Sequence, residues 1–350
     1  MSCSSADSEG STEREIIGSV DLCDHRGRLN PEARGWLRQP LLRANLGRAF
    51  GRKKRWDYWC VISPDVIVSF VYADIDYAGL ASVWILDRED LAESDAAMLV
   101  PFGRGFTLPD DVCTGTVTAS RNGFELTIDE HSDVTRLTAT APRSRLGEIA
   151  VDISVFKPVG HESLNVVIPW SDRRFQFTSK QNTRPASGSI RVGARAWAVG
   201  QGAPAYAVQD LGRGVWPYSN RWNWAAASGV VADGRTVGLQ FGGKWTEGTG
   251  FTENALCIDG RLTKIHEELE WRYDWDQPMR PWRVRTPGSG QVDVELTPFF
   301  DRYDSTDLKV LKMEVHQCFG TWTGTVCGDD GVAATLDGLD GFAEEARNRW

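Results

Sequence analysis

No stretch of this 350-residue chain holds the roughly 20 consecutive apolar residues that a membrane-spanning helix needs. The first residues, MSCSSADSEGSTERE, are acidic and rich in serine, without the apolar core of a secretory signal peptide. Cysteine is sparse, since seven residues without regular spacing favour reduced thiols over a disulfide framework. These absences predict a protein without a transmembrane segment, located in the cytoplasm.

Positive charge is in deficit, and a net charge of −9 argues against a nucleic-acid partner, because phosphate binding needs an electropositive face. The five histidines are scattered and no four-ligand zinc spacing is present. No serine lies in a G-x-S-x-G frame, and the GQG and GRG motifs at 200–202 and 212–214 do not open a helix. The sequence therefore predicts no metal and no organic cofactor, and it does not specify an oligomeric state.

Helical patterning is scarce, whereas period-two patterning is widespread. The strand-like segment 55–63, RWDYWCVIS, is apolar on both faces, as expected of a strand between a core and a cavity. Asn122-Gly123 is a strong hairpin signal. Only the ends suggest short helices: residues 31–39 after Asn30-Pro31, and residues 341–350, where apolar side chains recur every four residues. The predicted class is all-β, with antiparallel barrel or sandwich modules and short helices at the termini.

The order of motifs repeats once along the chain. Residues 55–59, RWDYW, are echoed by RWNW at 221–224, and each is followed by a Val-rich strand, a glycine-bearing stretch and an apolar strand ending in Asp87 or Asp259. We place the division in the polar, turn-rich segment after Trp170. The predicted organisation is a disordered tail over 1–14, an N-terminal β module over 15–180 and a C-terminal β module over 181–350.

The segment 209–262 concentrates aromatic rings among glycines and charged residues, which predicts the wall of a cavity for an apolar or flat ligand. A carboxyl held neutral in such a wall can protonate an alkene, and aromatic faces stabilise the resulting cation by about 0.5 to 2 kcal/mol each. The predicted catalytic acids are Asp210, Glu247 and Glu253. The predicted ligand-binding residues are Trp216, Tyr218, Trp222, Trp224, Lys244, Trp245 and Asn254.

Structural roles compete with each of these assignments. Asp210 has Arg213 within reach and precedes a glycine-rich turn, and Glu247 lies between Thr246 and Gly248 in a segment that suits an exposed loop. One of the two residues Glu253 and Asn254 must be buried and hydrogen-bonded on an apolar strand face. Lys244 suits pairing with a carboxylate, snorkelling or binding of an oxyanion. Trp222 and Trp224 share a strand face, which serves packing if it meets the other module and ligand stacking if it meets a lumen.

Four segments together resemble one family: NLGRAFGRKKRWDYW, DLGRGVWPYSNRWNWA, GLQFGGKWTEGTGFTENALCIDGRL, and TWTGTV followed by GFAEEARNRW. They resemble the domain of unknown function 2804 family from about Val20 onward, and that family name implies no activity. The two-module layout with Trp-rich strands is more distantly similar to the paired lipocalin-like barrels of carotenoid hydratases and tocopherol cyclases. That likeness implies lipocalin-like modules, apolar ligands and acid-catalysed chemistry, and it transfers no catalytic residue.

These observations predict a protein that binds a hydrophobic small molecule, of lipid or isoprenoid type, in a Trp-lined cavity. The predicted activity is that of a cofactor-independent hydratase, cyclase or isomerase. A non-catalytic lipid carrier is one alternative. A glycan-binding or glycoside-hydrolysing protein is another, because tryptophan stacks on sugar faces and paired carboxylates cleave glycosides.

Overall fold

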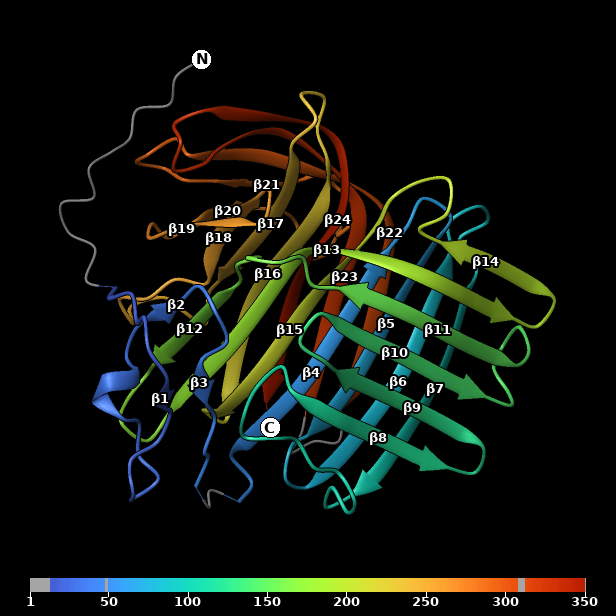
Figure 1. Cartoon of the computed structure of the whole chain (residues 1–350), viewed down its shortest axis with the longest axis horizontal. Helices are drawn as coiled ribbons and strands as arrows, with labels where there is room; N and C mark the ends of the chain where they lie inside the picture. The colour runs from blue at the N-terminus through green and yellow to red at the C-terminus, as the bar shows by residue number, and fades with distance from the viewer. Residues whose placement is uncertain (1–12, 48–49, 308–311, 350) are drawn as a thin grey trace.

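The computed structural model describes residues 13–47, 50–307 and 312–349, and almost all of its regular structure is β-strand (Figure 1). Two large antiparallel sheets curl into near-closed, barrel-like modules. The predicted all-β class with two modules is thereby confirmed. Within the described residues, no helix has the length and apolar character that crossing a membrane requires.

The first sheet runs in the order β7-β6-β5-β4-β15-β13-β11-β10-β9-β8. In addition, β12 and β14 pair with β13, and β2 pairs with β12. Its strands are β2 (Trp36–Leu37), β4 (Lys53–Ile62), β5 (Val66–Asp74), β6 (Ala78–Asp87), β7 (Glu93–Pro101), β8 (Gly115–Arg121), β9 (Phe124–Glu130), β10 (Val134–Ala141), β11 (Ile149–Phe156), β12 (Leu164–Pro169), β13 (Phe175–Val192), β14 (Arg195–Val199) and β15 (Ala205–Val215). A separate parallel pair joins β1 (Val20–Asp21) to β3 (Leu42–Arg43).

The second sheet runs in the order β19-β18-β17-β16-β24-β23-β22-β21-β20. Its strands are β16 (Ser219–Val230), β17 (Thr236–Gly243), β18 (Asn254–Ile258), β19 (Arg261–Ile265), β20 (Glu270–Arg272), β21 (Trp282–Arg285), β22 (Val292–Asp307), β23 (Lys312–Cys327) and β24 (Ala333–Arg349). In both sheets a four-strand meander starts at a Trp-rich strand, and that strand also pairs with the last strand of its module. The strand order thus repeats as the sequence motifs do.

The chain passes from the first sheet to the second between Val215 and Ser219, and residue 180, where the sequence analysis divides the chain, lies inside β13. Most of the polar, turn-rich segment after Trp170, where the division was placed, forms the 18-residue β13. Residues 1–12 of the predicted tail lie outside the described residues. Glu13 is buried against the second module, where it accepts a hydrogen bond from the Thr252 backbone N–H.

The predicted terminal helices are wrong. Asn30 does cap a helical turn, accepting from the Glu32 backbone N–H at 3.1 Å, but the turn is a 3₁₀ helix, η1 (Pro31–Ala33), and Trp36 and Leu37 leave it to pair with β12. Residues 341–349 belong to β24, which pairs with β16 on one side and β23 on the other. Two full ladders of hydrogen bonds, with apolar burial on both faces, outweigh the four-residue apolar spacing. Residue 350 lies outside the described residues.

Each module has its own apolar core, and a third apolar layer lies between the modules. Trp59 and Val61 of β4 belong to the core of the first module, whereas Cys60 and Ile62 face the second module. On β16, Ala225 and Ala227 belong to the core of the second module, and Trp224 faces the first. The two Trp-rich strands are therefore buried on both faces, as the pattern of RWDYWCVIS predicts.

Candidate functional site

The strands β17, β16 and β24 lie side by side and carry polar groups on both of their faces. Asn223 lies opposite Gly243 on one neighbour and Glu345 on the other. The next residue, Trp224, lies opposite Gly242 and Glu344. Successive side chains of a strand point to opposite faces. Asn223 and Glu345 therefore face the interior of the second module, whereas Trp224 and Glu344 face the first module.

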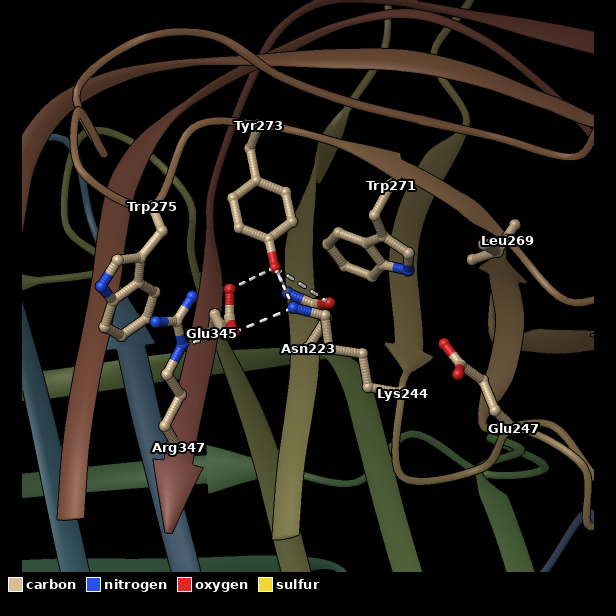
Figure 2. Close-up of a pocket in the computed structure, with 9 residues that line it drawn as sticks. All are labelled: Asn223, Lys244, Glu247, Leu269, Trp271, Tyr273, Trp275, Glu345 and Arg347. Atoms are coloured by element: carbon tan, nitrogen blue, oxygen red, sulfur yellow. Dashed lines mark hydrogen bonds and ion pairs between the residues drawn. The ribbon is translucent and has the colours of Figure 1, made fainter. Parts of the chain in front are cut away.

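On the interior face these strands border a cavity of about 380 Å³ that is open on one side (Figure 2). We call it the Tyr273 pocket. Its lining consists of Asn223, Lys244, Glu247, Leu269, Trp271, Tyr273, Trp275, Glu345 and Arg347. Two of these, Lys244 and Glu247, are predicted site residues.

The Tyr273 hydroxyl is the point on which this pocket's hydrogen bonds converge. It donates to Glu345 Oε2 and accepts from Lys244 Nζ, and it also accepts from Asn223 Nδ2 at 3.0 Å. The other oxygen of Glu345 lies 2.9 Å from Lys244 Nζ and 2.8 Å from Arg347 Nε. Figure 2 shows the phenol pointing at Asn223 and Glu345. Tyr273 is therefore held in one orientation by several elements of the module.

Electrostatics keep this phenol neutral and the carboxylate charged. Two causes raise the pKa of Tyr273 well above its ordinary value: burial is the larger, and the hydrogen-bonded Glu345 carboxylate is the second. Burial pushes the pKa of Glu345 upward, but hydrogen bonds from Arg347, Tyr273 and Lys244 outweigh it and leave that pKa below its ordinary value. Near neutral pH the pocket therefore presents a neutral hydroxyl backed by a carboxylate.

Aromatic rings form the walls of the Tyr273 pocket. The Tyr273 ring stacks on Trp282 at 3.9 Å between centroids, and the Arg347 guanidinium lies 3.6 Å from the centre of the Trp275 ring. Trp271 approaches β17 at Gly243, where a Cβ would come within 2.7 Å of the indole nitrogen. The glycine at 243 thus makes room for the Trp271 wall.

On the opposite face, Asp210 and Glu253 meet at a buried lysine. Lys180 lies opposite Asp210 in the β13–β15 ladder, and its Nζ is 2.9 Å from Asp210 Oδ1 and 3.1 Å from Glu253 Oε1. The same ammonium lies 4.2 Å from the centre of the Trp224 ring. We call Lys180, Asp210, Glu253 and Trp224 the junction cluster. Because Glu253 and Trp224 come from the second module, this cluster joins the two modules electrostatically.

The junction cluster is closed by further donors within the protein. Asp210 accepts from Trp56 Nε1 and Thr178 Oγ1, both at 3.1 Å, and Glu253 Oε2 accepts from Trp245 Nε1 at 3.2 Å. Burial raises the pKa of Glu253 above its ordinary value despite the attraction of Lys180. Asp210 thus pairs with Lys180, and the alternative pairing with Arg213 is wrong because Arg213 binds Asp57.

Glu344 lies beside this cluster on the same face. It accepts from Trp222 Nε1 at 2.8 Å and from Gln317 Nε2 at 3.0 Å. Burial raises its pKa to about 7. The junction therefore holds two carboxyl groups, Glu253 and Glu344, whose protonated forms are favoured by desolvation.

The predicted tryptophans pack against one another at this junction. Trp216 stacks on Trp245 at 5.6 Å between centroids and meets Trp222 edge-on at 5.8 Å. Trp224 is edge-on to Tyr58 of the first module at 5.4 Å. These four tryptophans cover the first module and are not among the side chains that line the Tyr273 pocket.

The remaining predicted residues are dispersed. Tyr218 is 42% exposed and lies over Arg52. Asn254 is buried and satisfied, accepting from the Gly242 backbone N–H at 2.8 Å and donating to the Glu267 carbonyl at 3.1 Å. Lys244 pairs with Glu345, and Glu247 is exposed at the pocket.

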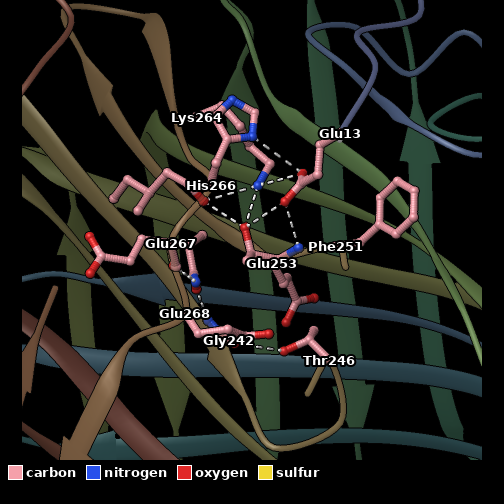
Figure 3. A network of polar contacts seen from close by, with 12 residues as sticks. Glu13, Gly242, Thr246, Phe251, Glu253, Lys264, His266, Glu267 and Glu268 are labelled. Carbon is pink, nitrogen blue, oxygen red and sulfur yellow. Dashed lines mark hydrogen bonds and ion pairs between the residues drawn. The ribbon is translucent and has the colours of Figure 1, made fainter. Parts of the chain in front are cut away.

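A third polar network, drawn in Figure 3, ties the start of the described chain to the second module. Lys264 Nζ lies 2.9 Å from Glu13 Oε2, and both side chains are almost fully buried. His266 Nδ1 lies 3.7 Å from the same oxygen. Within residues 13–47, 50–307 and 312–349, no three His, Cys, Asp or Glu side chains gather in a way that could hold a metal ion.

The family model of the domain of unknown function DUF2804 matches residues 13–350 of this chain. The chain belongs to the DUF2804 family. This match covers both modules and agrees with the resemblance carried by the sequence motifs. No curated protein shows significant sequence similarity to this DUF2804 chain.

Solved structures with similar architecture are distant. Kievitone hydratase from Nectria haematococca is 11% identical with a TM-score of 0.44, over 85% of this chain and 88% of its own. An AttH candidate from Nitrosomonas europaea is 12% identical with a TM-score of 0.43, over 85% and 92%. CghA in complex with Sch210972 is 10% identical with a TM-score of 0.42, over 85% and 88%.

Most of the Tyr273 pocket of this DUF2804 protein was missed by sequence reasoning. Trp271, Tyr273 and Trp275 alternate in the segment EWRYDW, so a period-two aromatic row was available as a signal. Glu345 and Arg347 also share a strand face, but the helical interpretation of 341–350 separated them. Lys180 was missed because it lies in the polar, turn-rich segment in which the division of the chain was placed.

Proposed function

We propose that the Tyr273 pocket binds a small molecule that has one flat or apolar face and one oxygen-bearing polar group. The flat face lies against Trp271 and Trp275, and the ligand oxygen replaces Glu345 Oε2 as the acceptor of the Tyr273 hydroxyl proton. The observation that carries this proposal is the convergence of Lys244, Asn223 and Glu345 on one phenol at a cavity of about 380 Å³. Cavities of this size are typical of small-molecule sites.

The proposed chemistry is proton transfer without an organic cofactor, as in a hydratase or isomerase. The phenol gives its proton to the ligand and takes one from the Lys244 ammonium, which already donates to the phenol oxygen, so no phenolate is left beside the Glu345 carboxylate. In a hydration, a water oxygen then adds to the ligand and the surplus proton of that water returns through the phenol to Lys244, so the net change is the addition of one water molecule. Glu345 holds Lys244 and Tyr273 in place during these steps.

In this proposal Asp210 and Glu253 join the modules, while the acid–base chemistry belongs to Tyr273. The support for this division is that Asp210 and Glu253 already share the Lys180 ammonium and accept indole N–H donors within the protein. A non-catalytic carrier would use the same walls and would leave the phenol without a chemical role.

The test is identification of the ligand that co-purifies with the protein from its own host, by native mass spectrometry. The wild type is expected to carry a small-molecule mass that the double variant Trp271→Ala, Trp275→Ala does not retain. Tyr273→Phe should keep the ligand and lose its conversion. Retention of the ligand by the double variant would place it elsewhere, and undiminished turnover in Tyr273→Phe would exclude the phenol as the acid.

A glycan ligand is the second candidate, favoured by the polarity of the pocket. Six of its nine lining side chains are polar or charged, and two of them are carboxylates, Glu247 and Glu345. Indole rings stack on sugar faces, and carboxylate pairs serve glycoside hydrolysis. The same mass spectrum decides between the candidates, because a hexose-spaced series lost in Trp275→Ala supports the glycan and a single apolar mass excludes it.

A further inference from the structure

The first module has a second hollow, far in sequence from the Tyr273 pocket. Its sheet ends at β7 on one side and β8 on the other, and each of these strands has a sheet partner on one side only. A groove of about 410 Å³ lies where β7 meets the β8–β9 turn and the β10–β11 turn. We call it the β7 groove.

The floor of the β7 groove is apolar. Met98, Phe124 and Ala141 line it, and all three are buried members of the core of the first module. Leu99, the neighbour of Met98 on the edge strand, is 63% exposed at the same groove. An apolar floor that continues into the module core is suited to a hydrocarbon chain.

The rim of the β7 groove carries two arginines, Arg121 and Arg143, both exposed. Among the described residues neither guanidinium has a hydrogen-bond or ion-pair partner, and no carboxylate belongs to the lining. Other exposed arginines of the described chain also lack a side-chain partner, namely Arg34, Arg104, Arg145, Arg173 and Arg221, but Arg121 and Arg143 share the rim of one apolar groove. A ligand head group of negative charge would therefore meet two unengaged donors.

The turns that present these arginines are fixed. Asn122 and Gly123 have φ of 54° and 85°, which fits a two-residue hairpin turn with both central residues in the left-handed region. A Cβ on Gly123 would lie 3.1 Å from the Pro142 ring, so the two turns pack closely together. Arg121 and Arg143 are thus attached to adjoining, well-defined turns.

We propose that the β7 groove binds a single-chain amphiphile with an anionic head group, such as a fatty acid. The hydrocarbon chain lies along Met98, Phe124 and Ala141, and the carboxylate accepts hydrogen bonds from Arg121 and Arg143. The proposal is independent of the Tyr273 pocket, because the two share no lining residue.

The experiment is calorimetric titration of the full-length protein with laurate, and with dodecyltrimethylammonium as the cationic probe of equal chain length, each below its micelle concentration. The wild type is expected to bind laurate in preference to the cation. The double variant Arg121→Glu, Arg143→Glu should bind laurate about tenfold more weakly and should reverse the preference. Added salt should weaken laurate binding to the wild type.

A matched pair at the exposed edge position provides the control for folding. Leu99→Glu and Leu99→Lys remove the same apolar side chain and differ only in charge, and laurate should bind the lysine variant more tightly. Trp271→Ala, in the Tyr273 pocket, should bind laurate as the wild type does. The proposal is overturned if the wild type does not bind laurate, if charge reversal at the rim or at Leu99 leaves its affinity unchanged, or if Trp271→Ala abolishes binding.

Discussion

The two faces of the strands β17, β16 and β24 carry ionisable groups in two different settings. The face toward the first module carries Glu344, beside the cluster of Lys180, Asp210 and Glu253. Lys180 and Glu253 are buried there, and the Asp210 side chain is 14% exposed. On the interior face, Lys244 and Glu345 pair beside an open cavity. Glu344 and Glu345, adjacent on β24, thus point to a closed junction on one face and to an accessible pocket on the other.

The difference shows that burial of an acid in an aromatic setting does not by itself make a reaction site. Glu253 has the raised pKa expected of a catalytic acid, but it is 2% exposed and does not line the Tyr273 pocket. Tyr273, in contrast, is one of the side chains that line a cavity. Access for a ligand is therefore the property that separates the two faces.

Replacing the two lysines should give the largest contrast. Lys180→Met leaves Asp210 and Glu253 buried without their shared cation, and we expect the free energy of unfolding to fall by about 3 to 5 kcal/mol. Lys244→Met is the matched control. Because Glu345 keeps Arg347 and Tyr273 as partners and the Lys244 side chain is 30% exposed, the loss there should be about 1 kcal/mol. Urea unfolding measures both, and equal losses would contradict the contrast.

The period-two pattern predicted most of the strands, because alternation is a local property of the chain. It did not predict β13, whose central residues are polar yet buried. Lys180 is tolerated there because Asp210 and Glu253 compensate its charge, and these partners lie 30 and 73 positions away in the sequence. Hydropathy cannot reveal such compensation, so the predicted division of the chain fell within this strand.

The candidate site was predictable only in part, for a related reason. The sequence identified Lys244 and Glu247, which lie in the aromatic-rich segment that drew attention. Tyr273 reaches the same cavity from the connection after β20, and Glu345 reaches it from β24. Which face of a strand meets a cavity depends on how the sheet curls, and no local pattern determines that.

The pH dependence of stability should differ between the faces. The pKa of Glu344 is raised to about 7 in the folded protein, so the folded state binds this proton more tightly than the unfolded state. Its contribution to stability is therefore fully present below the ordinary carboxyl pKa and is lost as the pH rises through about 7. The expected loss is about 3 kcal/mol at most. The pKa of Glu345 is lowered, so its contribution has the opposite sign and is lost on acidification.

The measurement is unfolding of the wild type and of Glu344→Gln at pH 5 and pH 8. The amide resembles the protonated acid, so the variant should lose less stability than the wild type between the two values. Glu345→Gln should be destabilised about equally at pH 5 and pH 8, and the difference from the wild type should shrink only when the pH falls below the ordinary carboxyl pKa of about 4.5. Parallel curves for Glu344→Gln and the wild type would show that Glu344 does not titrate in this range.

The smallest effect on stability is expected at Glu247, which sequence reasoning grouped with Glu253. Glu247 is exposed, so Glu247→Gln should change the free energy of unfolding by less than about 0.5 kcal/mol. It should nevertheless alter the pocket, where Lys244 and Arg347 are now balanced by Glu247 and Glu345. Removing one negative charge should strengthen binding of a flat anionic probe, 1-anilinonaphthalene-8-sulfonate, by a few-fold, and salt should reduce the gain. Glu295→Gln, on the exposed face of β22, is the matched control. Equal gains in both variants would mean that the probe responds to net charge and that Glu247 does not act at the pocket.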